Sequence, residues 1–404
     1  MDKLFEPKEL KGLKLRNRLV RSATYEGLAA RDGRCTPELV ELYKGLARGG
    51  VGLIISGYAW VHPSGQCARN MLAIDRDEVI PGLRLLTDAV HREGGAVALQ
   101  MVHGGVYAVR LLTGQPLKGP SPGKFPPWML EASAMSLEEI QEVIASFADA
   151  AGRAQEAGFD AVQLHSAHGY LFSQFLSPFY NQREDSYGAS TEGRARLVVE
   201  TCQRMREVVG REYPIFIKIN SEDYVEGGLD LEETARIVPL LEGAGYDAFE
   251  VSGGGHASPG NLGPSRKGIR SEDREAYFLP AALRLKEATS LPLMLVGGIR
   301  SLDVVEEVLA RRAADFVSLS RPLIREPGLP ARWLSGDRTP ATCTSCNRCF
   351  LTMVTRPMKC SAHDPGFKAF HERVEREAFH NQQDKGKHFY QRVWLGAIRQ
   401  KLDG

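Results

Sequence analysis

Short apolar runs alternate with longer amphipathic stretches along most of the chain. The runs are rich in Val, Ile, Leu, Ala and Phe and are bounded by Gly, Pro, Asp or Ser. Continuous apolar runs of this length are typical of parallel strands that are buried on both faces. Strands are therefore predicted at residues 18–23, 51–57, 96–101, 160–164, 214–220, 247–252, 291–298 and 314–321.

The stretches between these runs have helical periodicity. Thr36-Pro37-Glu38 provides an N-cap, a first-turn Pro and an acid near the positive end of a helix dipole. Ser136 with Glu139 has the spacing of a capping box. A Pro- and Gly-rich loop is expected at 114–127. Helices are predicted at about 36–49, 79–93, 136–157, 194–209, 231–244 and 276–289, with a short one after 301.

Eight strand–helix units favour an α/β fold of the closed (β/α)8 TIM-barrel type over an open doubly wound sheet. No G-x-G-x-x-G follows the first predicted strand, which further disfavours a dinucleotide-binding fold. The barrel is expected to comprise residues 1–336. Residues 337–404 are rich in charge and Cys and lack apolar periodicity, so they are expected to form a C-terminal extension.

Composition narrows the class of protein. The 404-residue chain is 43% hydrophobic and 25% charged, with a formal charge of +1. This balance argues against a nucleic-acid or anionic-membrane binder. The N-terminus lacks the apolar core of a signal peptide, and no apolar run approaches the roughly 18 residues of a membrane span. A soluble cytoplasmic protein is expected, and no motif specifies an oligomeric state.

The fourth predicted strand ends in a polar cluster of His165, His168 and Tyr170. In a (β/α)8 barrel the active site lies at the carboxyl ends of the strands. Imidazoles can hold a substrate oxygen, and a nearby phenol can deliver a proton. A lone His is more often a satisfied structural residue, but a cluster at a strand end favours a site.

The last two strands predict a phosphate site. Gly297-Gly298 allows close backbone approach and Arg321 offers a charged fork, at the strand ends where barrels often bind phosphate. Taken singly, the glycines could form a tight turn and Arg321 a surface salt bridge.

Two polar residues lie inside apolar strands. A buried Lys218 needs a negative partner, so it is a Schiff-base nucleophile, half of a buried salt bridge, or the counter-charge to an anionic cofactor. The predicted phosphate site favours the third reading. Gln100 suits an amide-like ring edge, or is a satisfied core residue.

These residues resemble the old yellow enzyme family of flavin-dependent NAD(P)H oxidoreductases. The resemblance covers residues 3–330. It rests on the run from His165 to Tyr170, on the segment Ser-Pro-Phe-Tyr-Asn-Gln-Arg-Glu-Asp-Ser-Tyr-Gly at 177–188, and on residues 4–7, 13–18 and 296–298.

The resemblance implies non-covalent FMN at the carboxyl end of the barrel. Gln100 would bond the pyrimidine edge, Gly57 would lie under the ring, and Lys218 would face N1 and O2 to stabilise the reduced anion. Gly298, Ser320 and Arg321 would hold the phosphate. Three further residues would line the flavin, namely Ser22, Ala23 and Thr24.

The implied reaction is a ping-pong reduction of an electron-poor alkene conjugated to a carbonyl. NAD(P)H reduces the flavin at N5, His165 and His168 hold the substrate oxygen, N5 returns the hydride and Tyr170 donates the proton. Tyr25 stands where many family members carry Cys or Thr. Its phenol would tune the flavin, act as a second proton donor, or pack on the cofactor.

Four clustered cysteines, Cys343, Cys346, Cys349 and Cys360, resemble the iron–sulfur motif of the branch with dienoyl-CoA reductases and trimethylamine dehydrogenase. Four thiolates can hold a [4Fe–4S] cluster or Zn²⁺. A second hypothesis is therefore a dehydrogenase or demethylase that passes electrons to an external acceptor. A Schiff-base lyase using Lys218 is the alternative of another class. A non-catalytic flavin or metal binder is disfavoured, because proton-donor groups cluster at the predicted site.

Overall fold

The computed structural model describes residues 2–350 and 357–362, and all of the predicted strands form. The barrel strands are β3 (Leu19–Arg21), β4 (Leu53–Ile55), β7 (Ala96–Val102), β11 (Ala161–Ser166), β12 (Ile215–Asn220), β13 (Ala248–Ser252), β14 (Leu293–Leu295) and β15 (Phe316–Leu319). They pair in parallel in the order β11-β12-β13-β14-β15-β3-β4-β7, and β7 pairs with β11. The predicted closed (β/α)8 barrel is confirmed.

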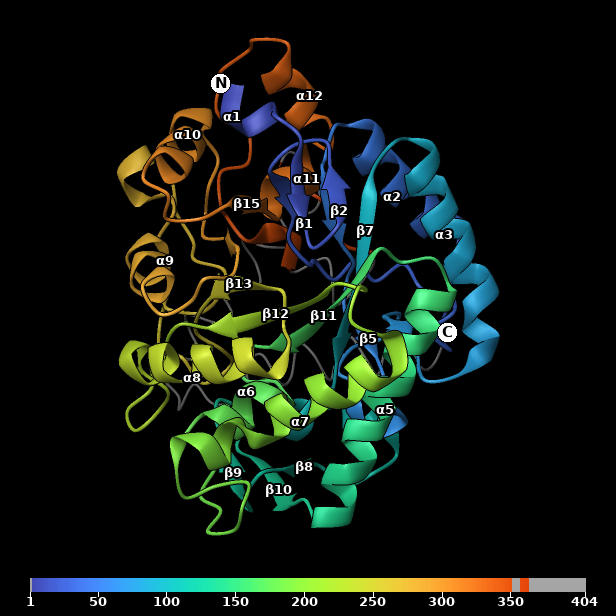
Figure 1. The fold of residues 1–404 in the computed structure, drawn as a ribbon, viewed down its shortest axis with the longest axis vertical. Coiled ribbons are helices and arrows are strands. Elements are labelled where there is room, and N and C mark those ends of the chain that lie inside the picture. The colour runs from blue at the N-terminus through green and yellow to red at the C-terminus, as the bar shows by residue number, and fades with distance from the viewer. Residues whose placement is uncertain (1, 351–356, 363–404) are drawn as a thin grey trace, which may run out of the picture.

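Helices surround this barrel (Figure 1). The predicted caps are present, because Thr36 accepts a hydrogen bond from the Leu39 amide and Ser136 forms a full capping box with Glu139. The larger helices are α2 (Pro37–Arg48), α3 (Ile80–Arg92), α5 (Leu137–Glu156), α7 (Thr191–Val209), α8 (Leu231–Ala244), α9 (Leu279–Lys286) and α10 (Leu302–Ala310). Three short helices, α6 (Leu171–Leu176), α11 (Arg321–Arg325) and α12 (Leu329–Leu334), were not predicted.

An N-terminal hairpin fills the amino end of the barrel. It consists of β1 (Lys8–Leu10) and β2 (Leu13–Leu15), preceded by α1 (Asp2–Phe5). Leu10 and Leu15 are buried in one apolar cluster with residues from the early part of the barrel strands, such as Phe216 and Phe316. Because this end is packed with apolar side chains, polar chemistry is confined to the carboxyl end.

The segment expected as a loop at 114–127 is partly a small sheet, so that prediction was wrong. It follows α4 (Arg110–Thr113) and contains β8 (Lys118–Gly119) and β9 (Gly123–Phe125), which pair with β10 (Leu130–Ala134). In Figure 1 this sheet lies at the opposite end of the molecule from β1 and β2. Two further short strands, β5 (Ala59–Trp60) and β6 (Leu72–Ala73), extend the barrel sheet beside β7.

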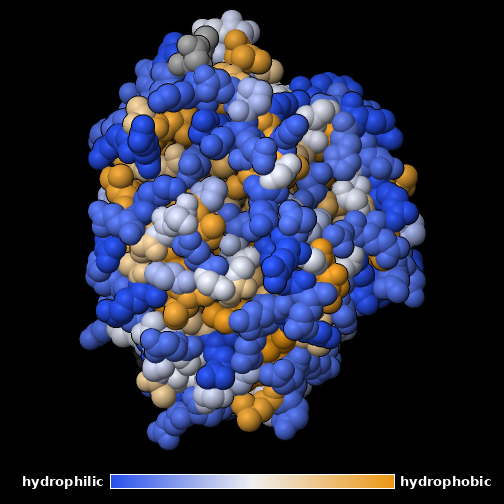
Figure 2. Space-filling model, in the orientation of Figure 1, coloured by the Kyte–Doolittle hydropathy of each residue, from blue (hydrophilic) through white to orange (hydrophobic). Residues whose placement is uncertain are grey.

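The face shown in Figure 2 is mainly hydrophilic, with scattered apolar side chains. Within the described ranges, no helix has both the length and the apolar character needed to cross a membrane. Most of the predicted extension, residues 351–356 and 363–404, lies outside the described residues.

Candidate active site

The polar cluster predicted after the fourth strand forms at the carboxyl end of the barrel. His165 lies in β11, and its ring stands edge-on to the rings of His168 and Tyr170, each with a centroid distance of 5.0 Å. His168 has a left-handed backbone, with φ 63°. Its amide donates to Asn220 Oδ1 at 3.0 Å, which ties the turn to β12.

Both imidazoles are neutral. Burial, together with the nearby Lys218 charge, holds the pKa of His165 well below its ordinary value. Burial also lowers the pKa of His168, whose Nε2 lies 2.7 Å from Ser252 Oγ. The Nδ1 of His165 is buried and has no hydrogen-bond partner among the described residues. Neutral imidazoles of this kind can bind and polarise an oxygen without acting as strong acids.

Tyr170 is held in its protonated form. Burial raises the pKa of its phenol well above the ordinary value, and the hydroxyl is hydrogen-bonded to Tyr58 and Cys67. The Tyr58 and Tyr170 rings meet edge to face at 5.8 Å. Neither Tyr58 nor Cys67 was predicted as a site residue, although Tyr58 directly follows Gly57 at the end of the second predicted strand.

The phenol of Tyr25 is turned away from this cluster. Its hydroxyl donates to the backbone carbonyl of Arg69, while its ring stacks on Tyr58 at 5.7 Å. A proton already committed to a buried carbonyl is poorly placed for transfer. Of the three roles predicted for Tyr25, packing fits this geometry best.

An aromatic wall faces Tyr170 from the loops after β7 and β13. His256 stacks on Tyr107 at a centroid distance of 4.3 Å and stands edge-on to Tyr170 at 5.3 Å. Trp128, from the β9–β10 turn, lies 5.5 Å from His256. Because a carbonyl only accepts, His256 Nδ1–H donates to the His168 carbonyl at 3.0 Å. The wall therefore presents aromatic ring faces and edges beside the Tyr170 phenol.

Lys218 forms the buried salt bridge that was one of its predicted readings. Its Nζ lies 2.9 Å from Glu250 Oε2, with side chains 4% and 0% exposed. It also donates to Ser22 Oγ at 2.9 Å. The sequence prediction missed Glu250, and the role of Lys218 as counter-charge to an anionic cofactor stays a prediction.

Gln100 lies in the same buried layer. Its Nε2 donates to Gln163 Oε1 at 2.7 Å, and Gln163 Nε2 donates to Glu250 Oε2 at 3.0 Å. Strand register explains these contacts, because Gln100 pairs with Gln163 and Lys218 pairs with Glu250 across neighbouring strands. The layer therefore crosses most of the barrel just below its carboxyl end.

The predicted lining residues after β3 border this layer. Thr24 Oγ1 lies 2.9 Å from Ser320 Oγ and donates to the Ser22 carbonyl. Ala23 is partly buried between them. The Gly57 amide donates to Tyr43 Oη at 2.8 Å and to a buried carboxylate, Glu26. A side chain at Gly57 would collide with that carboxylate, so only glycine fits there.

The predicted phosphate residues come together at the ends of β14 and β15. Gly297 and Gly298 have φ values of 145° and 71°, which other residues rarely adopt. Arg321 is buried and is not a surface salt bridge, since its Nη1 donates to the Arg266 carbonyl at 2.8 Å and to Asn347 Oδ1 at 2.6 Å.

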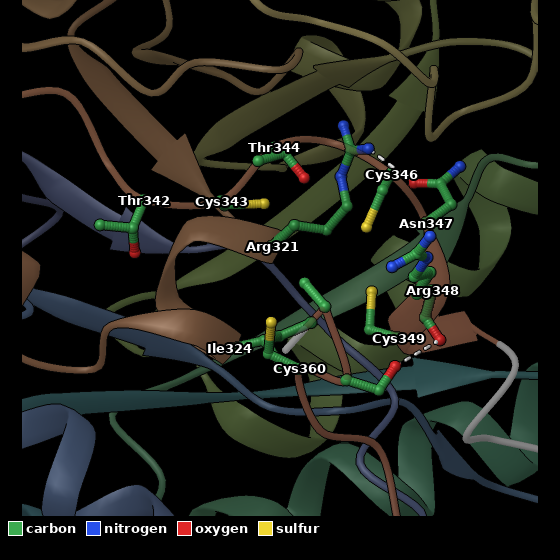
Figure 3. A pocket seen from close by; sticks show the side chains of 12 residues that line it. Arg321, Ile324, Thr342, Cys343, Thr344, Cys346, Asn347, Arg348, Cys349 and Cys360 are labelled. Carbon is green, nitrogen blue, oxygen red and sulfur yellow. Dashed lines mark hydrogen bonds between the residues drawn. The ribbon is translucent and has the colours of Figure 1, made fainter. Parts of the chain in front are cut away.

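The four clustered cysteines line one pocket with Arg321 (Figure 3). Burial raises the pKa of Cys349 to about 12 and also raises that of Cys343, while the Arg321 charge opposes both shifts. In the part of the chain that the structure describes, no group of three or more His, Cys, Asp and Glu side chains is arranged to hold a metal ion. The thiols are gathered but are not set at ligand positions.

These residues fit FMN at the ring end of the site. A buried cation, Lys218, and an amide, Gln100, can bond the polar edge of a flavin, and Gly57 allows the ring to lie close to the backbone. A closed barrel with this donor set and a protonated phenol at its carboxyl end defines a flavin-dependent oxidoreductase.

Comparison with known proteins identifies the family. The chain belongs to the NADH:flavin oxidoreductase / NADH oxidase family, whose model matches residues 3–339. The predicted resemblance to the old yellow enzyme family is thereby confirmed, and the family implies FMN and NAD(P)H as cofactors.

Relatives and solved structures agree. A metal reductase of Desulforamulus reducens is 36% identical over 89% of this chain but is covered over only 53% of its own length. An NADPH dehydrogenase of Bacillus pumilus is 34% identical over 81% of this chain and 93% of its own. A 2-naphthoyl-CoA reductase structure superposes with a TM-score of 0.84 at 28% identity, over 91% of this chain and 58% of that one. The chain thus spans about half the length of some relatives.

The buried histidines predict acid sensitivity. Burial lowers the pKa of His103 to about 3 and that of His256 to about 4, against an unfolded value near 6.5. Below pH 6.5 the unfolded chain binds more protons than the folded one, so stability falls as the pH drops. We expect a loss on the order of 1 kcal/mol for each such His between pH 7 and pH 5, measured by urea unfolding.

His256→Gln should flatten this pH dependence. The control is His91→Gln, because hydrogen bonding to Asp160 raises the pKa of His91 and gives that group the opposite sign. An unchanged pH dependence in His256→Gln would contradict the assignment of a neutral buried imidazole.

Proposed function

We propose that the protein is an FMN-dependent NAD(P)H oxidoreductase that reduces the C=C bond of α,β-unsaturated carbonyl compounds. The observation that carries this proposal is the meeting of two neutral imidazoles, His165 and His168, with a protonated phenol, Tyr170, beside the buried layer of Lys218 and Gln100. A hydride donor, an oxygen clamp and a proton donor are the components that such a reduction needs.

Each residue has a proposed part. FMN, when bound, accepts hydride from NAD(P)H and returns it to the alkene. Lys218 and Gln100 would hold its pyrimidine edge, and Gly298, Ser320 and Arg321 its phosphate. His165 and His168 would bind the substrate carbonyl oxygen and draw electron density toward it. Tyr170 would give its proton to the carbon next to that carbonyl.

The aromatic wall supports a flat substrate. Tyr107, Trp128 and His256 present ring faces and edges next to Tyr170. A planar conjugated carbonyl could lie against them with its oxygen toward the two imidazoles.

Two measurements test this proposal. The first is the absorbance spectrum of the purified protein, and the second is turnover with NADH or NADPH and a cyclic enone. Flavin bands that bleach with the nicotinamide and return with the enone are expected. A colourless protein that does not bind added FMN would refute it. Borohydride trapping tests the Schiff-base lyase alternative, because it would fix a substrate covalently to Lys218. The Lys218–Glu250 ion pair disfavours that alternative, since Schiff-base formation needs a neutral amine.

A second function is supported by the cysteine pocket. We propose that Cys343, Cys346, Cys349 and Cys360 bind a [4Fe–4S] cluster or Zn²⁺ after their side chains rearrange, as part of an extension from 337 onward. The shared pocket supports this, because all four cysteines line it. With a [4Fe–4S] cluster there, the enzyme would be a dehydrogenase or demethylase that passes electrons to an external acceptor, whereas redox-inactive Zn²⁺ would have a structural role.

Metal and sulfide analysis of anaerobically purified protein tests this second function. Cys346→Ser should lose the metal and retain the flavin. If the unaltered protein contains no iron and no zinc, this second function is excluded.

A further inference from the structure

Glu250 is the hub of the buried polar layer. It lies in the middle of β13 and is fully buried. One of its oxygens, Oε2, receives both the Lys218 ammonium at 2.9 Å and the Gln163 amide at 3.0 Å. The other oxygen, Oε1, is buried without a hydrogen-bond partner among the described residues.

An ionised carboxylate at this hub dictates the direction of every hydrogen bond in the layer. A carboxylate can only accept, so Gln163 must turn its NH₂ group toward Glu250 and its Oε1 toward Gln100. Gln100 must then present its own NH₂ to Gln163. Its Oε1 receives no hydrogen bond from any described residue, which leaves an acceptor free for a ligand.

The hub is charged. Burial alone would raise the pKa of the Glu250 carboxyl. The Lys218 charge and the hydrogen bonds from Ser22, Lys218 and Gln163 outweigh burial and lower the pKa below its ordinary value. The negative charge therefore offsets much of the Lys218 charge at the point where that side chain meets the cofactor site.

We propose that Glu250 is a positioning residue that acts through Lys218 and Gln100. Through Lys218 it sets the net charge at the pyrimidine edge of FMN, and hence the reduction potential of the flavin. Through Gln100 it sets the donor–acceptor pattern at that edge, and hence the affinity for FMN. This inference rests on the proposed function, since it requires FMN at this site. No contact between Glu250 and the cofactor is needed.

Glu250→Gln tests the charge. The variant keeps the shape but removes the negative charge, so Lys218 stabilises the reduced, anionic flavin more strongly. We expect the midpoint potential, measured by equilibration with a redox dye, to shift to a more positive value. At the midpoint of the unaltered protein, the ratio of reduced to oxidised flavin should rise from one to about ten.

Gln163→Leu tests the orientation. This variant leaves the ion pair intact but releases the Gln100 amide, so FMN affinity should fall about tenfold while the potential changes little. Glu233→Gln is the matched control, because Glu233 is a buried acid paired with Arg194 on the outer helices. It should leave both quantities unchanged.

Glu250→Asp covers the case in which Glu250→Gln does not fold. This variant keeps the carboxylate charge but moves it away from Lys218 by one methylene. The midpoint potential of the flavin should therefore rise by less than in Glu250→Gln. A flavin-loaded Glu250→Gln or Glu250→Asp with the potential of the unaltered protein would overturn the inference. If the unaltered protein binds no FMN, the proposed function fails first and takes this inference with it.

Discussion

Tyr170→Phe is expected to lower the rate of enone reduction about 100-fold, the lower end of the range for loss of a general acid. The hydroxyl is the only part removed, and the ring can keep its edge-on contacts with His165 and Tyr58. Reduction of the flavin by NAD(P)H should be unaffected, because that half-reaction needs no proton from the phenol. Stopped-flow measurement of the two half-reactions separates these effects.

Tyr25→Phe is the matched control for Tyr170→Phe. It removes a phenol from the same aromatic row, but one whose proton is bonded to the Arg69 carbonyl. Enone reduction should therefore stay within a few-fold of the unaltered rate. Full enone turnover in Tyr170→Phe, or a larger loss in Tyr25→Phe, would move the proton donor away from Tyr170.

Lys218→Met is expected to lower the free energy of unfolding by about 3–5 kcal/mol and to abolish tight FMN binding. The change leaves the Glu250 charge in the barrel interior without its counter-ion. Urea unfolding of the cofactor-free protein measures the first effect. Quenching of FMN fluorescence measures the second.

Two further variants separate stability from binding. Lys286→Met removes a cation from Asp315 at 2.9 Å, but these side chains are 30% and 28% exposed, so the cost should be under about 1 kcal/mol. Lys218→Met with Glu250→Leu removes both buried charges and should restore most of the stability without restoring FMN binding. Recovery of FMN binding in that double variant would show that Lys218 does not hold the cofactor.

The barrel could be predicted because its strands are buried on both faces. Segments such as Ile215–Asn220 and Ala96–Val102 are apolar runs interrupted only by Lys218 or Gln100 before their last residues, and their ends mark the site. The meeting of His165, His168 and Tyr170 followed from the position of one strand end, so local sequence was sufficient.

The sheet of β8, β9 and β10 could not be predicted in the same way. Its strands are short, two of them contain Gly, and Pro residues lie between them, all of which indicate a loop in sequence. β10 pairs with both β8 and β9, and Trp128 lies in the turn between β9 and β10. Trp128 was therefore missed as well.

Glu250 was missed for a different reason. The role of a single acid inside a buried strand depends on the side chains that it contacts. For Glu250 these belong to a layer on three other strands, formed by Lys218, Gln163 and Gln100. The sequence shows that Lys218 needs a negative neighbour but not which one. Strand register within the closed barrel supplies the answer.

The left-handed backbone of His168 limits how this site can evolve. With φ at 63°, the position tolerates His, Asn, Asp or Gly far better than a β-branched residue. Of these, His and Asn can bond a carbonyl oxygen as neutral donors, whereas Asp would bring a charge and Gly no donor. When relatives acquire new substrates, we therefore expect position 168 to change only from His to Asn. Larger substitutions are expected in the aromatic wall.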